Sequence, residues 1–258
     1  MLGIPTNATS LSLHALPGIG EILPGCDLAA VLLEALTAAG LALAPQDVLV
    51  VAQKVVSKAE GRFVCLDEVE PSHRARELAG ITGKDARLVE VILRESTEVL
   101  RARPNVLITR HRLGLVMAQA GVDRSNVPEA ERVLLLPADP DRSAASLRER
   151  LASACGVEVG VIVSDSFGRP WRLGTTNVAI GAAGVPALWD RRGETDRERR
   201  VLETTQVAWA DAVAAAAGLA MGEAAEGTPA VLVRGLRLAL PPQPARTLLR
   251  PLDEDMFR

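Results

Sequence analysis

The sequence predicts an α+β fold with mixed sheets and helices, because strand and helix patterns follow one another without strict alternation. Short apolar runs rich in β-branched residues, at 47–52 and 157–163, predict buried strands. Longer segments with helical spacing, at 28–39 and 143–155, predict helices. The 258 residues are 48% hydrophobic, which is enough for a large core. We expect one domain over residues 1–240, or two intimate subdomains, and then a C-terminal extension over residues 241–258.

The N-terminal half begins with two Pro-Gly turns and continues with alternating helix and strand patterns. Asp27 can cap the first helix and Gly40 can end it. The strand over 47–52 runs into a polar segment that contains Gln53, Lys54 and Lys58. Further along this half, the patterns predict helices over 73–78 and 85–100 and strands over 106–109 and 113–118, which would pair as a hairpin around 110–112.

The C-terminal half opens with a polar loop over 120–128 and a short strand over 133–136. Ser143 is a candidate cap for the helix over 143–155, and the following strand is expected to stop at Ser164. The remaining elements are an alanine-rich helix over 197–221, a polar loop over 222–229, a strand over 230–233 and a proline-rich surface tail after Pro241.

Composition argues against several classes of protein. The net charge of −3 and the 2% aromatic content provide neither a basic field nor stacking platforms for nucleic acid. The 3 cysteines are far apart and form no Cys-x-x-Cys pair, which favours a reducing cytoplasm over disulfides or zinc. The N-terminus lacks the features of a signal peptide, and the longest apolar stretch, at 212–221, is too short to span a bilayer.

A polar run follows the strand over 157–163 and carries the strongest chemical signal. Asp165 and Ser166 offer oxygen ligands for a hard cation such as Mg²⁺, and Arg169 and Arg172 can hold anionic oxygens. This combination indicates chemistry on phosphates. The alternative for Asp165 is a simple cap of the following turn.

Three further sets of polar residues are candidates for the same site. Asp123 can supply a second carboxylate to the metal and Asn126 can donate to a nucleotide, although such residues also stabilise ordinary loops. Lys54 and Lys58 can neutralise a polyphosphate, or can be solvated lysines. Glu223 follows a helix end, where a metal would offset its unfavourable position, but it can equally be a solvent-exposed acid. No Walker A motif and no Gly-x-Ser-x-Gly motif occurs in the sequence, which argues against a P-loop protein and a serine hydrolase.

Five stretches in this order resemble the coenzyme F420-0:L-glutamate ligase family, also called F420 γ-glutamyl ligases. They are LPGI at 16–19, DVLVVAQKVVSKAEGR at 47–62, AGVDRSNV at 120–127, SDSFGRPWRLGTTNVAIG at 164–181 and MGEAAEGTPAVLVRG at 221–235. The resemblance implies the stand-alone form without a nitroreductase-like domain, a non-P-loop ligase fold and an intertwined homodimer.

The resemblance also assigns roles to individual residues. Asp123 and Asp165 would hold one divalent ion, and Ser166 and Glu223 a second. Asp123, Asp165, Arg169 and Arg172 would be the catalytic set. The implied nucleotide-binding residues are Leu16, Pro17, Gly18, Ile19, Gln53, Lys58, Asn126, Met221, Gly222, Ala224, Ala225, Glu226, Gly227 and Thr228.

The implied reaction is the GTP-dependent addition of L-glutamate to the deazaflavin coenzyme F420-0, through an acyl phosphate, followed by γ-linked additions. It would use Mg²⁺ or Mn²⁺, with a monovalent cation such as K⁺ as a further candidate. Its partners would be small molecules and a second copy of the chain, with no nucleic acid and no membrane. The alternatives are another metal- and nucleotide-dependent ligase or phosphoryl-transfer enzyme on a different anionic acceptor, and a non-catalytic nucleotide sensor. The polar motifs disfavour a deazaflavin-dependent redox protein.

Overall fold

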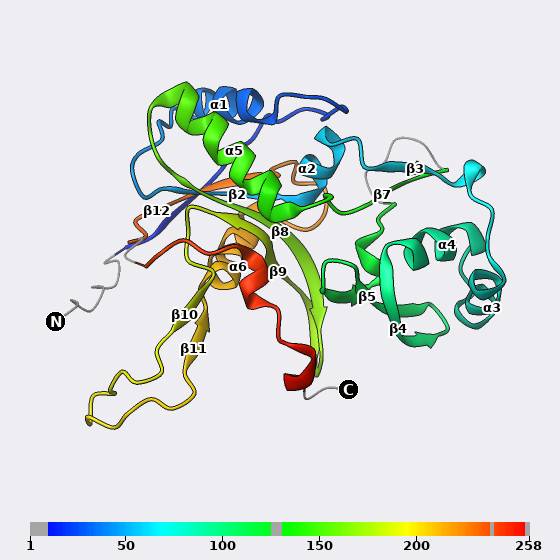
Figure 1. The fold of residues 1–258 in the computed structure, drawn as a ribbon. Coiled ribbons are helices and arrows are strands. Elements are labelled where there is room, and N and C mark those ends of the chain that lie inside the picture. Colours follow the sequence, from blue (N-terminus) through cyan, green and yellow to red (C-terminus); the bar gives the residue numbers. More distant parts are fainter. Residues whose placement is uncertain (1–9, 125–130, 238–239, 256–258) are drawn as a thin grey trace.

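The computed structural model describes residues 10–124, 131–237 and 240–255, and it confirms the α+β fold class (Figure 1). The main body is a five-stranded sheet in which β2 and β8 run parallel and the other neighbours antiparallel. Its strands, in spatial order, are β1 (Ser12–Ala15), β12 (Ala230–Arg234), β2 (Val48–Ala52), β8 (Gly160–Arg169) and β9 (Arg172–Ala183).

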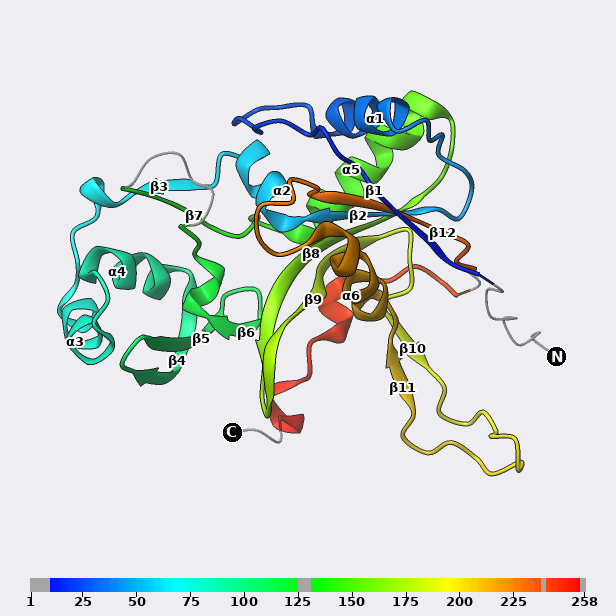
Figure 2. The ribbon, with the colours of Figure 1, turned by 180° about the vertical axis from the view of Figure 1, so that it is seen from behind.

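Helices cover both faces of this sheet. One face packs on α6 (Trp209–Met221), and the other on α1 (Leu28–Ala38), α2 (Gln53–Ala59) and α5 (Pro140–Cys155) (Figures 1 and 2). Alternate residues of β2 therefore enter different cores: Val48 and Val50 face α6, while Leu49 and Val51 face the other helices. Burial on both faces explains why the central strands read as continuous apolar runs.

A second lobe lies beside the main sheet (Figure 2). It consists of α3 (His73–Thr82), α4 (Ala86–Arg94) and a sheet of β4 (Ser96–Arg103), β5 (Val106–His111) and β6 (Val116–Ala118), with a hydrophobic core of its own. The strand pair β3 (Phe63–Cys65) and β7 (Arg132–Leu134) leads the chain into this lobe and back. The short 3-10 helices η1 (Leu66–Glu68) and η2 (Gln119–Gly121) complete it.

An arm and a C-terminal tail extend from the main body. The arm is the hairpin of β10 (Leu188–Asp190) and β11 (Gln206–Ala208) with its long connection (Figure 1). The tail, with η3 (Ala245–Leu248) and η4 (Leu252–Glu254), returns along β9 and buries Ala245. None of the described helices is long and apolar enough to cross a membrane.

Two predicted helices were wrong over part of their length. The helix expected over 85–100 ends at Arg94, and the following residues form β4, where β-branched Thr97 and Val99 favour a strand. The helix expected over 197–221 begins only at Trp209, because the preceding residues belong to the arm and to β11. Asp139, not Ser143, caps α5: its carboxylate accepts from the Arg142 N–H at 3.1 Å.

The predicted end of the strand at Ser164 was also wrong. Strand β8 continues through Asp165 and Ser166 to Arg169 and pairs with β9 along the way. Trp171 makes the reversal with a φ of 65° in the left-handed region. The polar run is therefore a long hairpin and not a loop, because the Thr-Thr-Asn segment at 175–177 pairs with residues 166–168.

Candidate functional site

The parallel pairing of β2 and β8 positions the candidate site. Ala52 at the end of β2 lies opposite Ser164 in β8, so the segments after these two residues meet at one edge of the sheet. The residues after Ala52 form α2, and the residues after Ser164 are the polar part of β8. Loops at 19–22 and 221–229 join them around a cavity of about 530 Å³. Crevices at such strand ends are the usual ligand sites of sheets with this arrangement.

Two lysines of α2 lie in this cavity, and each contacts a carboxylate. Lys54 Nζ lies 2.7 Å from Asp123 Oδ2, and Lys58 Nζ lies 2.5 Å from Glu21 Oε1. The Lys58 side chain is only 6% exposed, whereas that of Glu21 is 53% exposed. Lys58 is therefore a buried cation with a movable partner. An anionic ligand can replace Glu21 at Lys58 without leaving a buried charge unpaired.

Asp165 lies among like charges on the same wall. Burial raises the pKa of Asp165 to about 7, and the negative charges of Asp123 and Glu223 add to this effect. The Ser166 N–H, which donates to Asp165 Oδ1 at 2.9 Å, and the Lys54 charge oppose it. A cation bound here would favour the ionised carboxylate.

Neutral polar side chains form the part of the cavity next to α6. Ser164 is 2% exposed, and its Oγ has no hydrogen-bond partner among the described residues. Asn177 in β9 is also buried and lies across from Ser166. Gly218 in α6 allows this arrangement, because a Cβ there would lie 2.3 Å from Asn177 Nδ2. The Ser164 hydroxyl inside a polar cavity is therefore able to bind a ligand oxygen or an ion.

The loop after α6 is organised by its own side chains. Thr228 Oγ1 donates to the Met221 carbonyl at 2.7 Å, and the Ala224 N–H donates to Glu226 Oε2 at 2.8 Å. This second bond holds the pKa of Glu226 below its usual range. Gly222 has a φ of 75°, and a Cβ there would collide with the Glu226 side chain. The loop is thus preorganised around the end of the cavity.

The donor set fits hard divalent ions. Asp123, Asp165, Ser166 and Glu223 all line the cavity and offer oxygen atoms, which Mg²⁺ and Mn²⁺ prefer. Within the described residues, no three carboxylate, imidazole or thiol groups converge closely enough to form a protein-only cage. The side chains therefore suit an ion that completes its coordination with ligand oxygens and water, as Mg²⁺ usually does when it accompanies phosphates.

Most of the residues predicted from the sequence gather in this cavity. They are Ile19, Gln53, Lys58, Asp123, Asp165, Ser166, Met221, Gly222, Glu223, Ala224, Ala225, Glu226, Gly227 and Thr228. Leu16 is buried in the core, and neither Pro17 nor Gly18 is among the lining residues. Asn126 lies outside the described residues.

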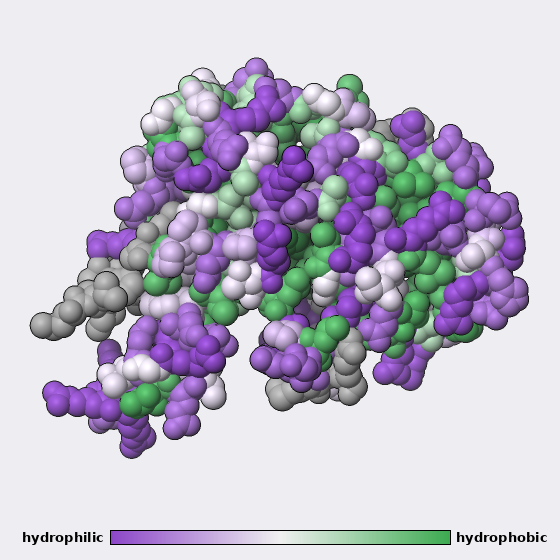
Figure 3. Space-filling model, viewed as in Figure 1, coloured by the Kyte–Doolittle hydropathy of each residue, from purple (hydrophilic) through white to green (hydrophobic). Residues whose placement is uncertain are grey.

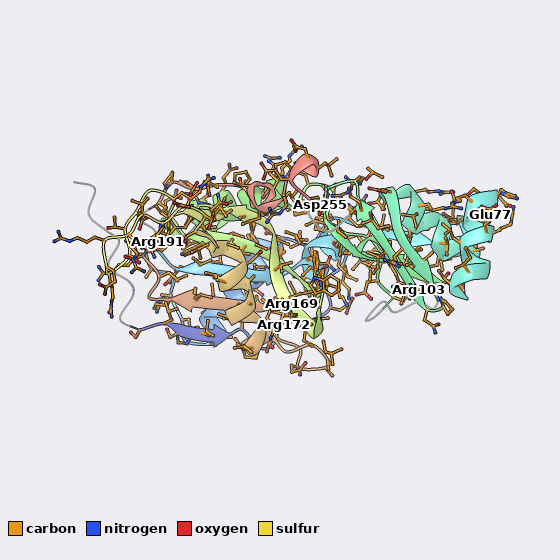
Figure 4. All side chains as sticks on the ribbon, turned by 90° about the horizontal axis from the view of Figure 1, so that it is seen from below. Glu77, Arg103, Arg169, Arg172, Arg191 and Asp255 are labelled. Carbon is orange, nitrogen blue, oxygen red and sulfur yellow. The ribbon has the colours of Figure 1, made fainter. Side chains whose placement is uncertain are left out.

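The two predicted catalytic arginines do not lie in the cavity. Arg169 and Arg172 pair across the tip of the β8–β9 hairpin and lie next to each other in Figure 4. Arg169 Nη1 donates to the Gly174 carbonyl at 3.3 Å, and neither guanidinium forms an ion pair with a described residue. A role for them at the cavity of their own protomer is not supported by this arrangement.

Three polar lining residues, Glu21, Ser164 and Asn177, were missed in the sequence. Glu21 follows a glycine turn and gives no signal of its pairing with Lys58, which is 37 residues away. Ser164 and Asn177 become recognisable only when β8 and β9 are paired, because this pairing places Asn177 opposite Ser166, next to Ser164 along β8. The alternation of polar residues in two strands of one hairpin is the signal that could have found them.

Comparisons with known proteins all identify similarity to one family over most of the chain. The family described as F420-0:Gamma-glutamyl ligase matches residues 18–235. A protein of Methanopyrus kandleri named Coenzyme F420:L-glutamate ligase is 49% identical over 100% of both chains. A protein of the same name from Methanothermobacter thermautotrophicus is 45% identical, over 96% of this chain and 99% of its own. Another from Archaeoglobus fulgidus is 48% identical, over 75% of this chain and 77% of its own.

Proposed function

Because the chain belongs to the F420-0:gamma-glutamyl ligase family, we propose that it attaches L-glutamate to coenzyme F420-0 and then adds glutamate through γ-links. We place this activity in the cytoplasm, with GTP as the co-substrate. The observation that carries the proposal is the full-length similarity to proteins named Coenzyme F420:L-glutamate ligase, combined with a cavity whose side chains suit a polyphosphate.

We propose that the reaction proceeds through an acyl phosphate. The acceptor carboxylate attacks the γ-phosphorus of GTP, the bond to the β-phosphate oxygen breaks, and GDP leaves. The amine of glutamate, after losing a proton, attacks the resulting acyl carbon, and inorganic phosphate leaves as the amide forms. Lys58, once Glu21 releases it, can bind phosphate oxygens, and the loop at 221–228 can enclose the nucleotide.

Divalent ions would be held by Asp123 and Asp165 at one position and by Ser166 and Glu223 at another. When bound, Mg²⁺ or Mn²⁺ supplies positive charge that stabilises the transferring phosphoryl group. Five carboxylates and two lysines line the cavity, so a triphosphate needs added cations there. A monovalent cation such as K⁺ is a further candidate for the neutral wall at Ser164.

We propose that the missing guanidinium groups come from a second copy of the chain in an intertwined homodimer. The hairpin tip that carries Arg169 and Arg172 also exposes two large hydrophobic residues, Trp171 at 90% and Leu173 at 99%. Apolar side chains at such exposure, next to unpaired cations, are typical of a surface that another chain covers.

The test incubates the purified protein with F420-0, L-glutamate, GTP and MnCl₂, and resolves the products by mass. We expect the product masses to rise by one or more glutamate residues, with release of phosphate. Asp165→Ala should abolish this turnover and leave the fold intact, whereas Glu34→Ala on the exposed face of α1 should not change it. GTP binding without phosphate release would instead indicate a sensor, and product with a different acceptor would indicate another ligase. Normal ligation by Asp165→Ala at saturating metal would refute the metal role.

A further inference from the structure

A second cavity, of about 350 Å³, lies at the free edge of β9. The C-terminal tail at η3, the start of α5 and the turn between β5 and β6 enclose it. Figure 3 shows hydrophobic side chains on the face between η3 and the second lobe, where this cavity opens. Its volume lies at the lower end of the range of small-molecule sites, about 300–1,000 Å³.

The walls of this cavity are mostly apolar. Phe167 and Val178 come from the β8–β9 hairpin, Leu115 from the turn before β6, and Leu248 from η3. Each of these four side chains is only partly buried, so each has surface left to contact a ligand. Flat aromatic molecules are suited to such a site, because they bury a large area on apolar walls without many hydrogen bonds.

A carboxylate at the back of the cavity adds a specific polar contact. Asp211 Oδ1 accepts a hydrogen bond from the Ala179 N–H of the edge strand at 2.9 Å. Asp211 Oδ2 has no partner among the described residues, and it is not among their fully buried polar atoms, so it is open to the cavity. An N–H or O–H donor of a ligand can therefore reach it.

The two cavities adjoin on one strand pair. Asp165, in the first cavity, lies directly across from Val178, which lines the second. Residues that face each other in an antiparallel pair point to the same side, with Cβ atoms about 4.5–5.5 Å apart. Phe167, two residues after Asp165, also points to this side and lines the second cavity. A molecule that reaches from Val178 to Asp165 can therefore occupy both cavities.

We propose that the cavity at β9 binds the planar heteroaromatic ring of the acceptor, with a ring N–H or O–H donating to Asp211 Oδ2 and the acidic end of the acceptor reaching Asp165. This inference rests on the proposed function for the identity of the ring. It adds a ring-binding subsite and makes Val178 and Asp211 determinants of acceptor specificity.

The test uses a probe that cannot be ligated: the 8-hydroxy-5-deazaflavin ring with only its ribityl chain, which lacks the phosphate and carboxylate. Its fluorescence is titrated with the full chain in the absence of GTP. Val178→Phe fills the cavity, and Asp211→Asn presents an amide N–H where the carboxylate oxygen lay. We expect each to weaken probe binding about tenfold or more, relative to the wild type. Ile81→Phe, on the exposed surface of α3, is the matched control and should bind as the wild type does.

Steady-state kinetics of the same variants complete the test. We expect the KM for F420-0 to rise and the KM for GTP to stay unchanged. If Val178→Phe does not fold, Leu115→Trp fills the cavity from its other wall. The ring subsite is overturned if the wild type ligates normally but both variants bind the probe as the wild type does. It is also overturned if the wild type ligates normally and does not bind the probe. In both cases the proposed function stands. Probe binding that depends on Val178 and Asp211, without any ligation by the wild type, would reject the function and support the subsite.

Discussion

At the scale of residues, the candidate site is defined by how its charges pair. Both lysines of α2 are paired with carboxylates, and Asp165 is left beside two further acids. The pair of Lys58 and Glu21 differs from that of Lys54 and Asp123, because Glu21 is the more exposed acid and belongs to a loop. We therefore expect Glu21, and not Asp123, to exchange with a phosphate.

Replacing Glu21 with Gln should strengthen nucleotide binding. The glutamate competes with phosphate for Lys58, and an ion pair with one exposed partner contributes up to about 1 kcal/mol. We expect the Kd for GTP in Glu21→Gln to fall about two- to fivefold, measured by calorimetry. Glu34→Gln removes the same charge from the exposed face of α1 and should leave the Kd unchanged. Weaker GTP binding in Glu21→Gln would show that Glu21 itself holds the nucleotide or its metal.

The charged residues of the site could be predicted from the sequence, whereas their partners could not. Asp123, Asp165 and Lys58 stand out because charged side chains next to buried apolar strands cost free energy unless they are paired or bind a ligand. Glu21 contacts Lys58 across 37 residues, a separation that no local pattern encodes. The two arginines were placed with the acids because they are close in sequence, but the extended strand carries them away at about 3.3 Å per residue.

At the scale of elements, α6 and the β8–β9 hairpin shape the site through close packing. Asn177 contacts the backbone of α6 at Gly218, so the helix can approach the hairpin only where a side chain is missing. The same helix ends at Gly222 and leads into the loop that closes the first cavity. Changes in the middle of α6 should therefore affect both stability and ligand binding.

Gly218→Ala should destabilise the protein by about 1–3 kcal/mol, because the new methyl group would lie 2.3 Å from Asn177 Nδ2. The matched change Gly80→Ala in α3, where no atom lies within 4 Å, should instead stabilise it by about 0.5–1 kcal/mol. Urea unfolding of both variants measures the difference. Equal effects would mean that helix propensity, and not the contact with Asn177, determines the result.

Glu95, at the end of α4, joins the second lobe to the main body and should make stability depend on pH. The pKa of Glu95 lies below its ordinary value of 4.5. The interaction with His111 is the main cause, and the charges of Arg112 and Arg62 add to it. The ionised form is thus favoured by folding, so its contribution is complete above the ordinary pKa and is lost as the pH falls through the lowered pKa.

Glu95→Gln should consequently lower the free energy of unfolding at pH 7 by about 1–3 kcal/mol, since it removes the negative charge that Arg62, Arg112 and the buried His111 contact. The difference from the wild type should shrink when unfolding is measured near pH 3. Glu77→Gln breaks only exposed pairs and should change stability by less than about 0.5 kcal/mol at either pH. A pH-independent effect of Glu95→Gln would contradict the assigned cause.

Central strands and capped helices were predictable, whereas elements that depend on tertiary pairing were not. Asp27 caps α1 as expected, since its carboxylate accepts from the Ala30 N–H at 3.1 Å. The first part of β4 was predicted as a continuation of α4, because Glu98 and Leu100 are good helix formers and only the pairing with β5 makes this segment a strand. The arm before α6 was predicted as helix for the same reason, since β11 becomes a strand only by pairing with β10.

At the scale of the whole molecule, the hairpin tip and the arm extend from an otherwise closed body (Figures 1 and 2). The tip combines Trp171 and Leu173, almost fully exposed, with Arg169 and Arg172. The proposed homodimer would cover these apolar side chains and complete the charge of the site. The arrangement of the main sheet, with α6 on one face and three helices on the other, needs no partner.

Sedimentation should reveal an assembly with twice the 27.3 kDa mass of the chain. The double variant Trp171→Ser and Leu173→Asp should shift it toward the monomer and reduce ligation at the same time, because the arginines then lose their place in the partner's site. Val106→Ser, which removes an apolar side chain that is 41% exposed in the second lobe, should leave the mass unchanged. A wild type that sediments as a monomer and still ligates glutamate would reject the dimer.

The way in which β9 ends the main sheet has a consequence for solubility. Edge strands with free N–H groups recruit strands from other molecules and so promote aggregation. In β9, Asp211 accepts from the Ala179 N–H and Asp141 accepts from the Ala182 N–H, so two of these groups are already bonded to carboxylates. Any chain that approached this edge would meet negative charge and would find no free donors at those two positions. The edge is thereby protected against amyloid-like growth.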